Sequence, residues 1–124
     1  MTIRTYIGLG SNLGDSQQIL SEAVAKLAAL GVVKVSQLYQ SPPMGPQDQP
    51  NYLNAVVQLD TALEPLALLD QLQQFEQDAG RVRSRTWGER TLDLDLLIYG
   101  QQHIQNDRLT VPHVGILERD FVVI

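Results

Sequence analysis

The strongest constraint on the fold is the order in which two hydrophobic periodicities follow one another along the chain. Segments in which apolar and polar residues alternate are typical of half-buried strands, whereas apolar residues that recur every three or four positions are typical of amphipathic helices. The expected order is strand, helix, strand, strand, helix, strand. This order matches a ferredoxin-like β-α-β-β-α-β arrangement, in which helices pack on an antiparallel sheet, so the sequence predicts the α+β class.

Strands are expected where alternation or β-branched residues dominate. The ranges are Ile3–Leu9, Val32–Tyr39, Tyr52–Leu59 and Leu92–Tyr99, then a turn at Gly100–Gln101 and shorter strands at His103–Ile104 and Phe121–Ile124. The Tyr52–Leu59 range alternates most regularly, and it places Tyr52 and Asn54 on the face opposite Leu53. One side of this strand should therefore be polar and aromatic.

Two helices are expected, each with a recognisable beginning and end. The first begins after Asp15, which can form a capping box with Gln18, and Gly31 suits the C′ position just beyond its last turn. The second has Pro65 at its first position and ends at Gly80. Both therefore have the length and the apolar stripe of helices that cover one face of a sheet.

The segment Pro42–Asn51 separates the second expected strand from the third. It contains four prolines, which stiffen the backbone and disfavour regular structure, so we expect a loop. A linker between two domains is the alternative interpretation. Because the chain has 124 residues, we expect residues 1–124 to form one domain.

Composition excludes several classes of protein. The longest apolar run, Leu27–Val33, is too short to span a membrane, and the N-terminus has no signal-peptide pattern, so a cytoplasmic protein without a membrane partner is expected. The chain has no cysteine, which excludes disulfides and thiolate zinc sites. A net charge of −5 argues against general nucleic-acid binding.

A cluster of arginines stands out in this acidic chain. Four of its seven arginines lie between Arg81 and Arg90. Such a cluster favours an anionic partner, and the planar guanidinium group can bind phosphate oxygens through two hydrogen bonds. The alternative is a solvated loop whose arginines pair with surface carboxylates.

Two aspartates follow the arginine cluster directly. Asp93 and Asp95 are two residues apart on an expected strand, so their side chains should share one face. Paired carboxylates repel one another, and Mg²⁺ relieves that repulsion because it prefers one or two carboxylates together with water and substrate phosphates. The pattern predicts a site for magnesium and phosphate, with room for two ions. Solvent-facing acidic residues without a metal are the alternative.

Several aromatic and polar residues suit a flat heterocyclic ligand. The candidates are Trp87, Tyr52 and Phe121, which can stack on a ring, and Asn54, whose amide offers both a donor and an acceptor. For each aromatic residue, ordinary core packing is the alternative. His113 could donate to a phosphate or a nucleotide, or could be a turn residue, whereas His103 is most simply a surface residue.

At this point the sequence resembles one family, the 6-hydroxymethyl-7,8-dihydropterin pyrophosphokinases of folate biosynthesis. The resemblance runs from Tyr6 to Phe121 and is carried by Gly10–Asn12, Ser41–Ala55, Gly80–Arg83, Trp87–Gly88, Arg90–Asp95, Arg108–His113, Arg119 and Phe121. It implies transfer of the β,γ-diphosphate of ATP to the hydroxymethyl oxygen of the pterin, with release of AMP. ATP and 6-hydroxymethyl-7,8-dihydropterin are the implied ligands, and two Mg²⁺ ions are the implied cofactors.

The resemblance also implies a role for each matching residue. Asp93 and Asp95 would hold the two Mg²⁺ ions, and Arg81, Arg83 and Arg90 would contact the triphosphate. The pterin would be framed by Tyr52, Asn54, Trp87 and Phe121, with backbone groups around Ser41, Pro42 and Met44. Along ATP would lie Gln73, Glu76, Arg108, Thr110, His113 and Arg119.

The sequence departs from the family pattern in a few places. The Arg83–Trp87 spacing is one residue short, Thr86 and Val114 replace commoner residue types, and the chain stops at Ile124, short of the family's C-terminal portion. A truncated module that binds pterin or nucleotide with little or no activity is therefore the alternative function. A ferredoxin-like domain that binds RNA or a protein is a third interpretation.

Overall fold

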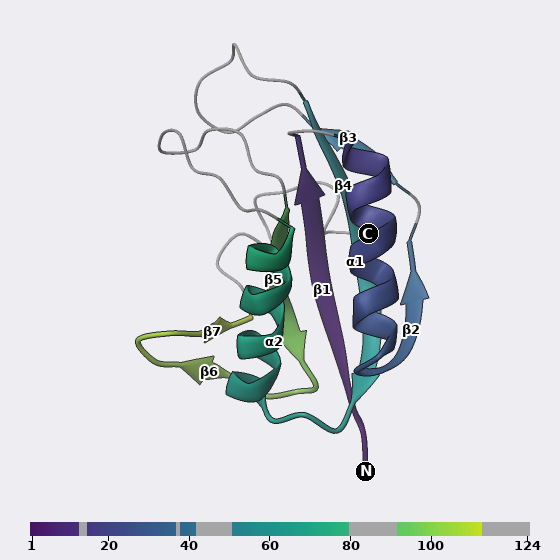
Figure 1. Ribbon diagram of the computed structural model, residues 1–124. Helices are drawn as coiled ribbons and strands as arrows, with labels where there is room; N and C mark the ends of the chain where they lie inside the picture. Colours follow the sequence, from purple (N-terminus) through teal and green to yellow (C-terminus); the bar gives the residue numbers. More distant parts are fainter. Residues whose placement is uncertain (13–14, 37, 42–50, 80–91, 113–124) are drawn as a thin grey trace.

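A computed structural model describes residues 1–12, 15–36, 38–41, 51–79 and 92–112. Figure 1 shows the elements, which in chain order are β1 (Ile3–Ser11), α1 (Ser16–Ala28), β2 (Gly31–Val35), β3 (Tyr39–Ser41), β4 (Tyr52–Thr61), α2 (Pro65–Asp78), β5 (Asp93–Tyr99), β6 (Ile104–Gln105) and β7 (Thr110–Val111). Neither described helix is long and apolar enough to cross a membrane.

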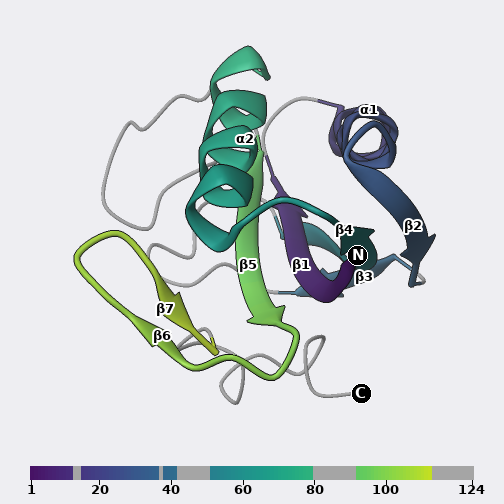
Figure 2. The ribbon, with the colours of Figure 1, turned by 90° about the horizontal axis from the view of Figure 1, so that it is seen from below.

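The sheet has the topology that the sequence predicts. Its strand order is β2-β4-β1-β5, β3 extends it beside β4, and every neighbouring pair is antiparallel. Both helices lie on the same side of this sheet (Figure 2). The α+β, ferredoxin-like prediction is therefore confirmed.

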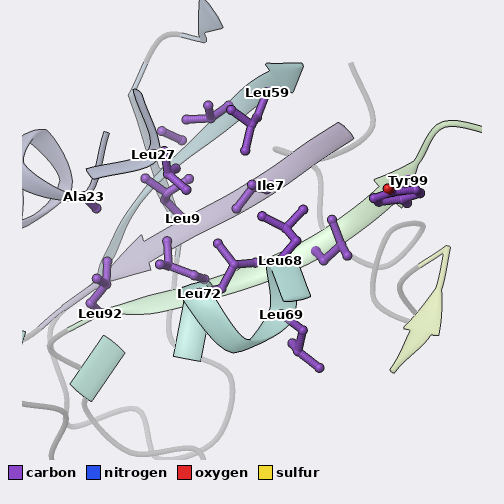
Figure 3. Packing of buried hydrophobic residues seen from close by; sticks show 14 of the residues in the cluster. Ile7, Leu9, Ala23, Leu27, Leu59, Leu68, Leu69, Leu72, Leu92 and Tyr99 are labelled. Carbon is purple, nitrogen blue, oxygen red and sulfur yellow. The ribbon is translucent and has the colours of Figure 1, made fainter. Parts of the chain in front are cut away.

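The core fills the space between the helices and the sheet. Ile7 and Leu9 on β1 are buried against Leu27 of α1 and against Leu68 and Leu72 of α2 (Figure 3). Since β1 is a central strand that both helices cover, its odd-numbered residues are apolar or carry small hydroxyl groups. The even-numbered residues of β1 and β4 face the other side, away from the helices, and the candidate site is built on that side.

The expected strand at Val32–Tyr39 is wrong in one respect, because it is two strands. Val35 pairs with Val57 of β4, and Tyr39 pairs with Asn54 of β4. Tyr39 is four residues after Val35, but Asn54 is only three residues before Val57, so the register shifts by one residue between the two pairs. At this break the Ser36 hydroxyl accepts a hydrogen bond from the Val56 N–H at 2.9 Å. A side-chain oxygen thus replaces a ladder carbonyl and separates β2 from β3.

The helix starts agree with the sequence, and one helix end does not. Asp15 accepts a hydrogen bond from the Gln18 N–H at 3.3 Å, but the Gln18 side chain donates to Glu22 instead of closing the capping box. Pro65 begins α2 as expected, whereas Gly80 lies outside the described residues. The placement of Gly31 at the C′ position is wrong, since α1 ends at Ala28 with its C-cap at Ala29, and Gly31 begins β2.

The reason for a glycine at position 31 is a close approach between two strands. A Cβ atom there would lie 2.0 Å from the carbonyl oxygen of Asp60. We therefore expect Gly31→Ala to lower the free energy of unfolding by about 1–3 kcal/mol or more, because backbone must move to make room. Urea denaturation measures this loss.

Gly8→Ala is the matched control for Gly31→Ala. Gly8 also lies in a strand, but a Cβ atom there would meet only the Leu97 side chain, at 3.4 Å or more. Its effect should stay within about 1 kcal/mol, the range of an ordinary glycine-to-alanine change. Equal urea midpoints for the two variants would contradict the close-approach explanation.

The segment after β5 forms a ribbon of its own. Gly100 adopts a positive φ of 54° in the expected turn, and β6 then pairs with β7 and does not return along β5. The Asn106 side chain accepts hydrogen bonds from the backbone N–H groups of Arg108 and Leu109, which closes the turn between β6 and β7. The strand expected at His103–Ile104 therefore begins at Ile104 with a different partner, and the one expected at Phe121–Ile124 lies outside the described residues.

Candidate active site

The candidate site lies where β1 ends and where β4 and β5 begin, on the face of the sheet away from the helices. The register places Gly10 of β1 directly between Asn54 of β4 and Asp93 of β5. One row further along, Gly8 lies between Val56 and Asp95. Because neighbouring strands are about 4.8 Å apart, the Cα atoms of Asn54 and Asp93 are about 10 Å apart.

Asp93 and Asp95 share one face of β5, as the sequence predicts. Both are half-buried, and the intervening Leu94 is buried on the helix side. Their Cα atoms are about 6.5–7 Å apart, as for any two alternate residues of a strand. Their cross-strand neighbours, Gly10 and Gly8, have no side chains, so β1 places nothing but backbone beside the two carboxylates.

This pair fits the ligand preference of magnesium. No group of three or more histidine, aspartate or glutamate side chains that could enclose a metal occurs among the described residues. Mg²⁺ needs no such enclosure, because it keeps several water molecules and commonly binds through one or two carboxylates and substrate phosphates. Asp93 and Asp95 therefore suit an ion that arrives with a polyphosphate.

Tyr52 and Asn54 form the other half of the site. The Asn54 amide is buried, and its Nδ2 donates to the carbonyl oxygens of Tyr39 and Tyr52, at 3.4 Å each. A Cβ atom on Gly10 would lie 3.3 Å from Asn54 Oδ1 and 3.5 Å from Tyr52 Cδ1. The Cβ position of Gly10 is thus bordered by an acceptor oxygen and an aromatic ring.

A second group of expected site residues meets on α2. Arg108, next to β7, donates from Nη2 to Gln73 Oε1 at 3.3 Å and also to Asp70 Oδ1. Thr110 lies two residues further along, exposed on β7. The structure therefore brings two of the expected ATP residues, Gln73 and Arg108, into direct contact.

Sequence reasoning missed Asp70. It is an exposed helix residue, and nothing in the local pattern connects it to Arg108, 38 residues away. An exposed ion pair of this kind contributes about 0–1 kcal/mol to stability, so its main effect is to orient the guanidinium group.

Glu76 is buried, with only 6% of its surface exposed. Its Oε2 accepts a hydrogen bond at 2.9 Å from the backbone N–H of Leu94, the residue between Asp93 and Asp95. This residue of α2 therefore contacts the strand that carries the two aspartates.

The remaining expected site residues are Ser41 and nine residues that the structure does not describe. Ser41 is the last residue of β3, opposite Tyr52 in register. Outside the described residues lie Pro42, Met44, Arg81, Arg83, Trp87, Arg90, His113, Arg119 and Phe121.

Comparison with known proteins identifies the family. A sequence model of 7,8-dihydro-6-hydroxymethylpterin-pyrophosphokinase (HPPK) matches residues 6–124. A Haemophilus influenzae protein named 2-amino-4-hydroxy-6-hydroxymethyldihydropteridine pyrophosphokinase is 51% identical over 125 residues, which cover 98% of this chain and 78% of that protein. Proteins of the same name from Bacillus subtilis and Pseudomonas putida are 46% and 52% identical, over 72% and 96% of their own lengths. The chain belongs to the 7,8-dihydro-6-hydroxymethylpterin-pyrophosphokinase family.

Proposed function

We propose that the chain transfers the β,γ-diphosphate of ATP to 6-hydroxymethyl-7,8-dihydropterin in folate biosynthesis, with the pterin and the polyphosphate meeting above Gly10. The observation that carries this placement is the row formed by Asn54, Gly10 and Asp93 on three adjacent strands. The row has a buried amide on one side of Gly10 and a carboxylate on the other, which supports a ring-binding group at Asn54 and a metal-binding group at Asp93.

In this proposal the pterin lies against Tyr52 and Asn54. The Asn54 amide nitrogen donates to two backbone carbonyls, and its oxygen is an acceptor that suits an N–H on the edge of the heterocycle. Stacking on the Tyr52 ring fixes the plane of the pterin. The residues assigned to the same pocket by family resemblance are Ser41, Pro42, Met44, Trp87 and Phe121.

ATP lies on the other side of Gly10, with its polyphosphate at Asp93 and Asp95 and its nucleoside beyond the outer edge of β5, the last strand of the described sheet, toward α2. The nucleoside would lie near Gln73, Arg108 and Thr110. Arg81, Arg83, Arg90, His113 and Arg119 are further ATP residues by resemblance. The resemblance also assigns Glu76 to ATP, but its side chain is buried and accepts from the Leu94 N–H. Guanidinium groups around the triphosphate bind its oxygens and stabilise the negative charge that builds up during transfer.

Asp93 and Asp95 are the residues that would hold magnesium, with two ions expected. When bound, Mg²⁺ neutralises phosphate charge and orients the oxygens that it contacts. In the reaction, the hydroxymethyl oxygen bonds to the β-phosphorus of ATP and loses its proton. The bond from that phosphorus to the oxygen bridging to the α-phosphate breaks, and AMP leaves with that oxygen.

Product analysis tests this function. We expect the purified chain, given ATP, the pterin and Mg²⁺, to form AMP and pterin diphosphate in equal amounts, whereas transfer of a single phosphate would give ADP. A chain that binds both ligands but forms no AMP would instead be a binding module. Omission of the pterin is the control, since AMP formation must depend on the acceptor.

A further inference from the structure

Glu76 interrupts a stripe of leucines on the buried face of α2. Leu68, Leu72 and Glu76 recur every four residues, and their exposed fractions are 0, 0 and 6%. The position therefore faces the interior, where a carboxylate is costly unless it is well hydrogen-bonded. Positions on the buried stripe of a helix are normally apolar. A polar residue at such a position often has a functional reason.

The hydrogen bond that Glu76 accepts comes from a particular point of β5. This strand is the end of the sheet, with β1 on one side and no strand paired on the other among the described residues. On the side of β5 away from β1, Glu76 Oε2 accepts a buried hydrogen bond from the Leu94 N–H at 2.9 Å. A side chain of α2 thus does what the carbonyl of a neighbouring strand would do.

This bond restrains the backbone that carries the two aspartates. The Leu94 N–H belongs to the planar peptide unit that joins Asp93 to Leu94, and Asp95 follows one residue later. A fixed peptide plane restricts the direction in which the Asp93 side chain projects from β5. It restricts the direction of the Asp95 side chain as well. One turn earlier, α2 also holds Arg108 through Gln73.

We propose that Glu76 is a positioning residue, which acts through the Leu94 peptide to hold Asp93 and Asp95 at the separation and direction that magnesium requires. This inference rests on the proposed role of Asp93 and Asp95. It gives α2 a second task besides covering the sheet, since one helix then aligns the metal ligands and the Arg108 contact together. Outer residues that orient metal ligands typically change metal affinity about 10- to 100-fold when they are removed.

Three variants of the full chain test the proposal by two measurements. Glu76→Ala removes the acceptor, Glu76→Gln keeps an acceptor oxygen without the charge, and Leu72→Ala is a matched control that removes a buried side chain one turn away. The first measurement is hydrogen exchange of the Leu94 amide, which needs no substrate. The second is the affinity for Mn²⁺, a paramagnetic substitute for Mg²⁺, in the presence of a non-hydrolysable ATP analogue.

We expect Glu76→Ala to exchange the Leu94 amide about 10- to 100-fold faster, because the amide loses its side-chain acceptor. Its Mn²⁺ affinity should fall about 10- to 100-fold. Glu76→Gln should restore most of both values. Leu72→Ala should accelerate exchange of the core amides together and leave Mn²⁺ affinity unchanged.

Two results would overturn the proposal. One is a Glu76→Ala protein whose Leu94 amide stays protected or whose Mn²⁺ affinity is unchanged. The other is a Glu76→Gln protein with a protected Leu94 amide and weak Mn²⁺ binding, because the charge itself would then be what matters. If the alanine variant does not fold, Glu76→Gln still tests the proposal, since a protected Leu94 amide together with weak Mn²⁺ binding would contradict it. Absence of AMP formation by the unmodified chain would be a separate failure, of the proposed function.

Discussion

Asp95→Ala should reduce the rate of diphosphate transfer by about 10³-fold or more while leaving pterin affinity much less affected. A metal-holding carboxylate supports several kcal/mol of transition-state stabilisation, and each 1.36 kcal/mol corresponds to about tenfold in rate. Pterin affinity should persist because Tyr52 and Asn54 lie on the other side of Gly10 from β5. Steady-state AMP formation gives the rate, and equilibrium binding of the pterin gives its affinity.

Asp60→Ala is the matched control for Asp95→Ala. Asp60 is also a strand aspartate on the face away from the helices, but it pairs with Arg4 at the opposite end of the sheet. Its removal costs an exposed ion pair, which contributes little to stability, and should not change turnover. Turnover that survives in Asp95→Ala would remove the assignment of this aspartate to the metal.

Gly10→Val should weaken pterin binding by about 10- to 200-fold, the range for a steric misfit in a ligand pocket. Valine is compatible with strand backbone, so β1 should persist as a strand. The substitution places the valine side chain beside Asn54 and Tyr52. Binding of an ATP analogue should change little, since the residues proposed to contact the nucleoside, Gln73, Arg108 and Thr110, lie on α2 and on or next to β7. Equilibrium titrations with each ligand separate the two effects.

A graded series strengthens this test. In Gly10→Ala the added Cβ atom already lies 3.3 Å from Asn54 Oδ1, which is tight but not prohibitive. Pterin affinity should therefore fall in the order glycine, alanine, valine, while the urea midpoint shows that each variant is folded. A valine variant that binds pterin as well as the unmodified chain would place the pterin elsewhere.

Much of the fold could be predicted from the sequence, because periodicity reports which residues of an element face the core. The alternation in β4 and β5 predicts that Tyr52 and Asn54 share one face of their strand, and that Asp93 and Asp95 share one face of theirs, without reference to any tertiary contact. The helices followed from three- and four-residue spacing and from Asp15 and Pro65 at their starts.

The errors arose where distant residues decide the local structure. Gly31 is explained by the Asp60 carbonyl of another strand, and the division of β2 from β3 follows from a hydrogen bond between Ser36 and Val56. β6 pairs with β7 because a turn closed by Asn106 brings them together. Local periodicity predicts none of these contacts, because each joins residues of different segments.

The same distinction applies to the candidate site. The family resemblance assigns Gln73, Glu76 and Arg108 to ATP, but no local pattern indicates that Asp70 accepts a hydrogen bond from Arg108. Nor could spacing indicate that Glu76 bonds to the peptide between the two aspartates, since this requires α2 to lie beside β5. Composition and motif therefore indicate which chemistry is present, and packing determines how it is aligned.

Counting bound metal ions tests the central claim most directly. With a non-hydrolysable ATP analogue present, we expect Mn²⁺ titration followed by electron paramagnetic resonance to give about two ions per chain, the number that a two-metal phosphoryl-transfer site holds. A chain with both Asp93→Ala and Asp95→Ala should lose these ions and still bind the pterin. If that variant bound as many ions as the unmodified chain, polyphosphate and metal would have to meet somewhere other than the end of β5.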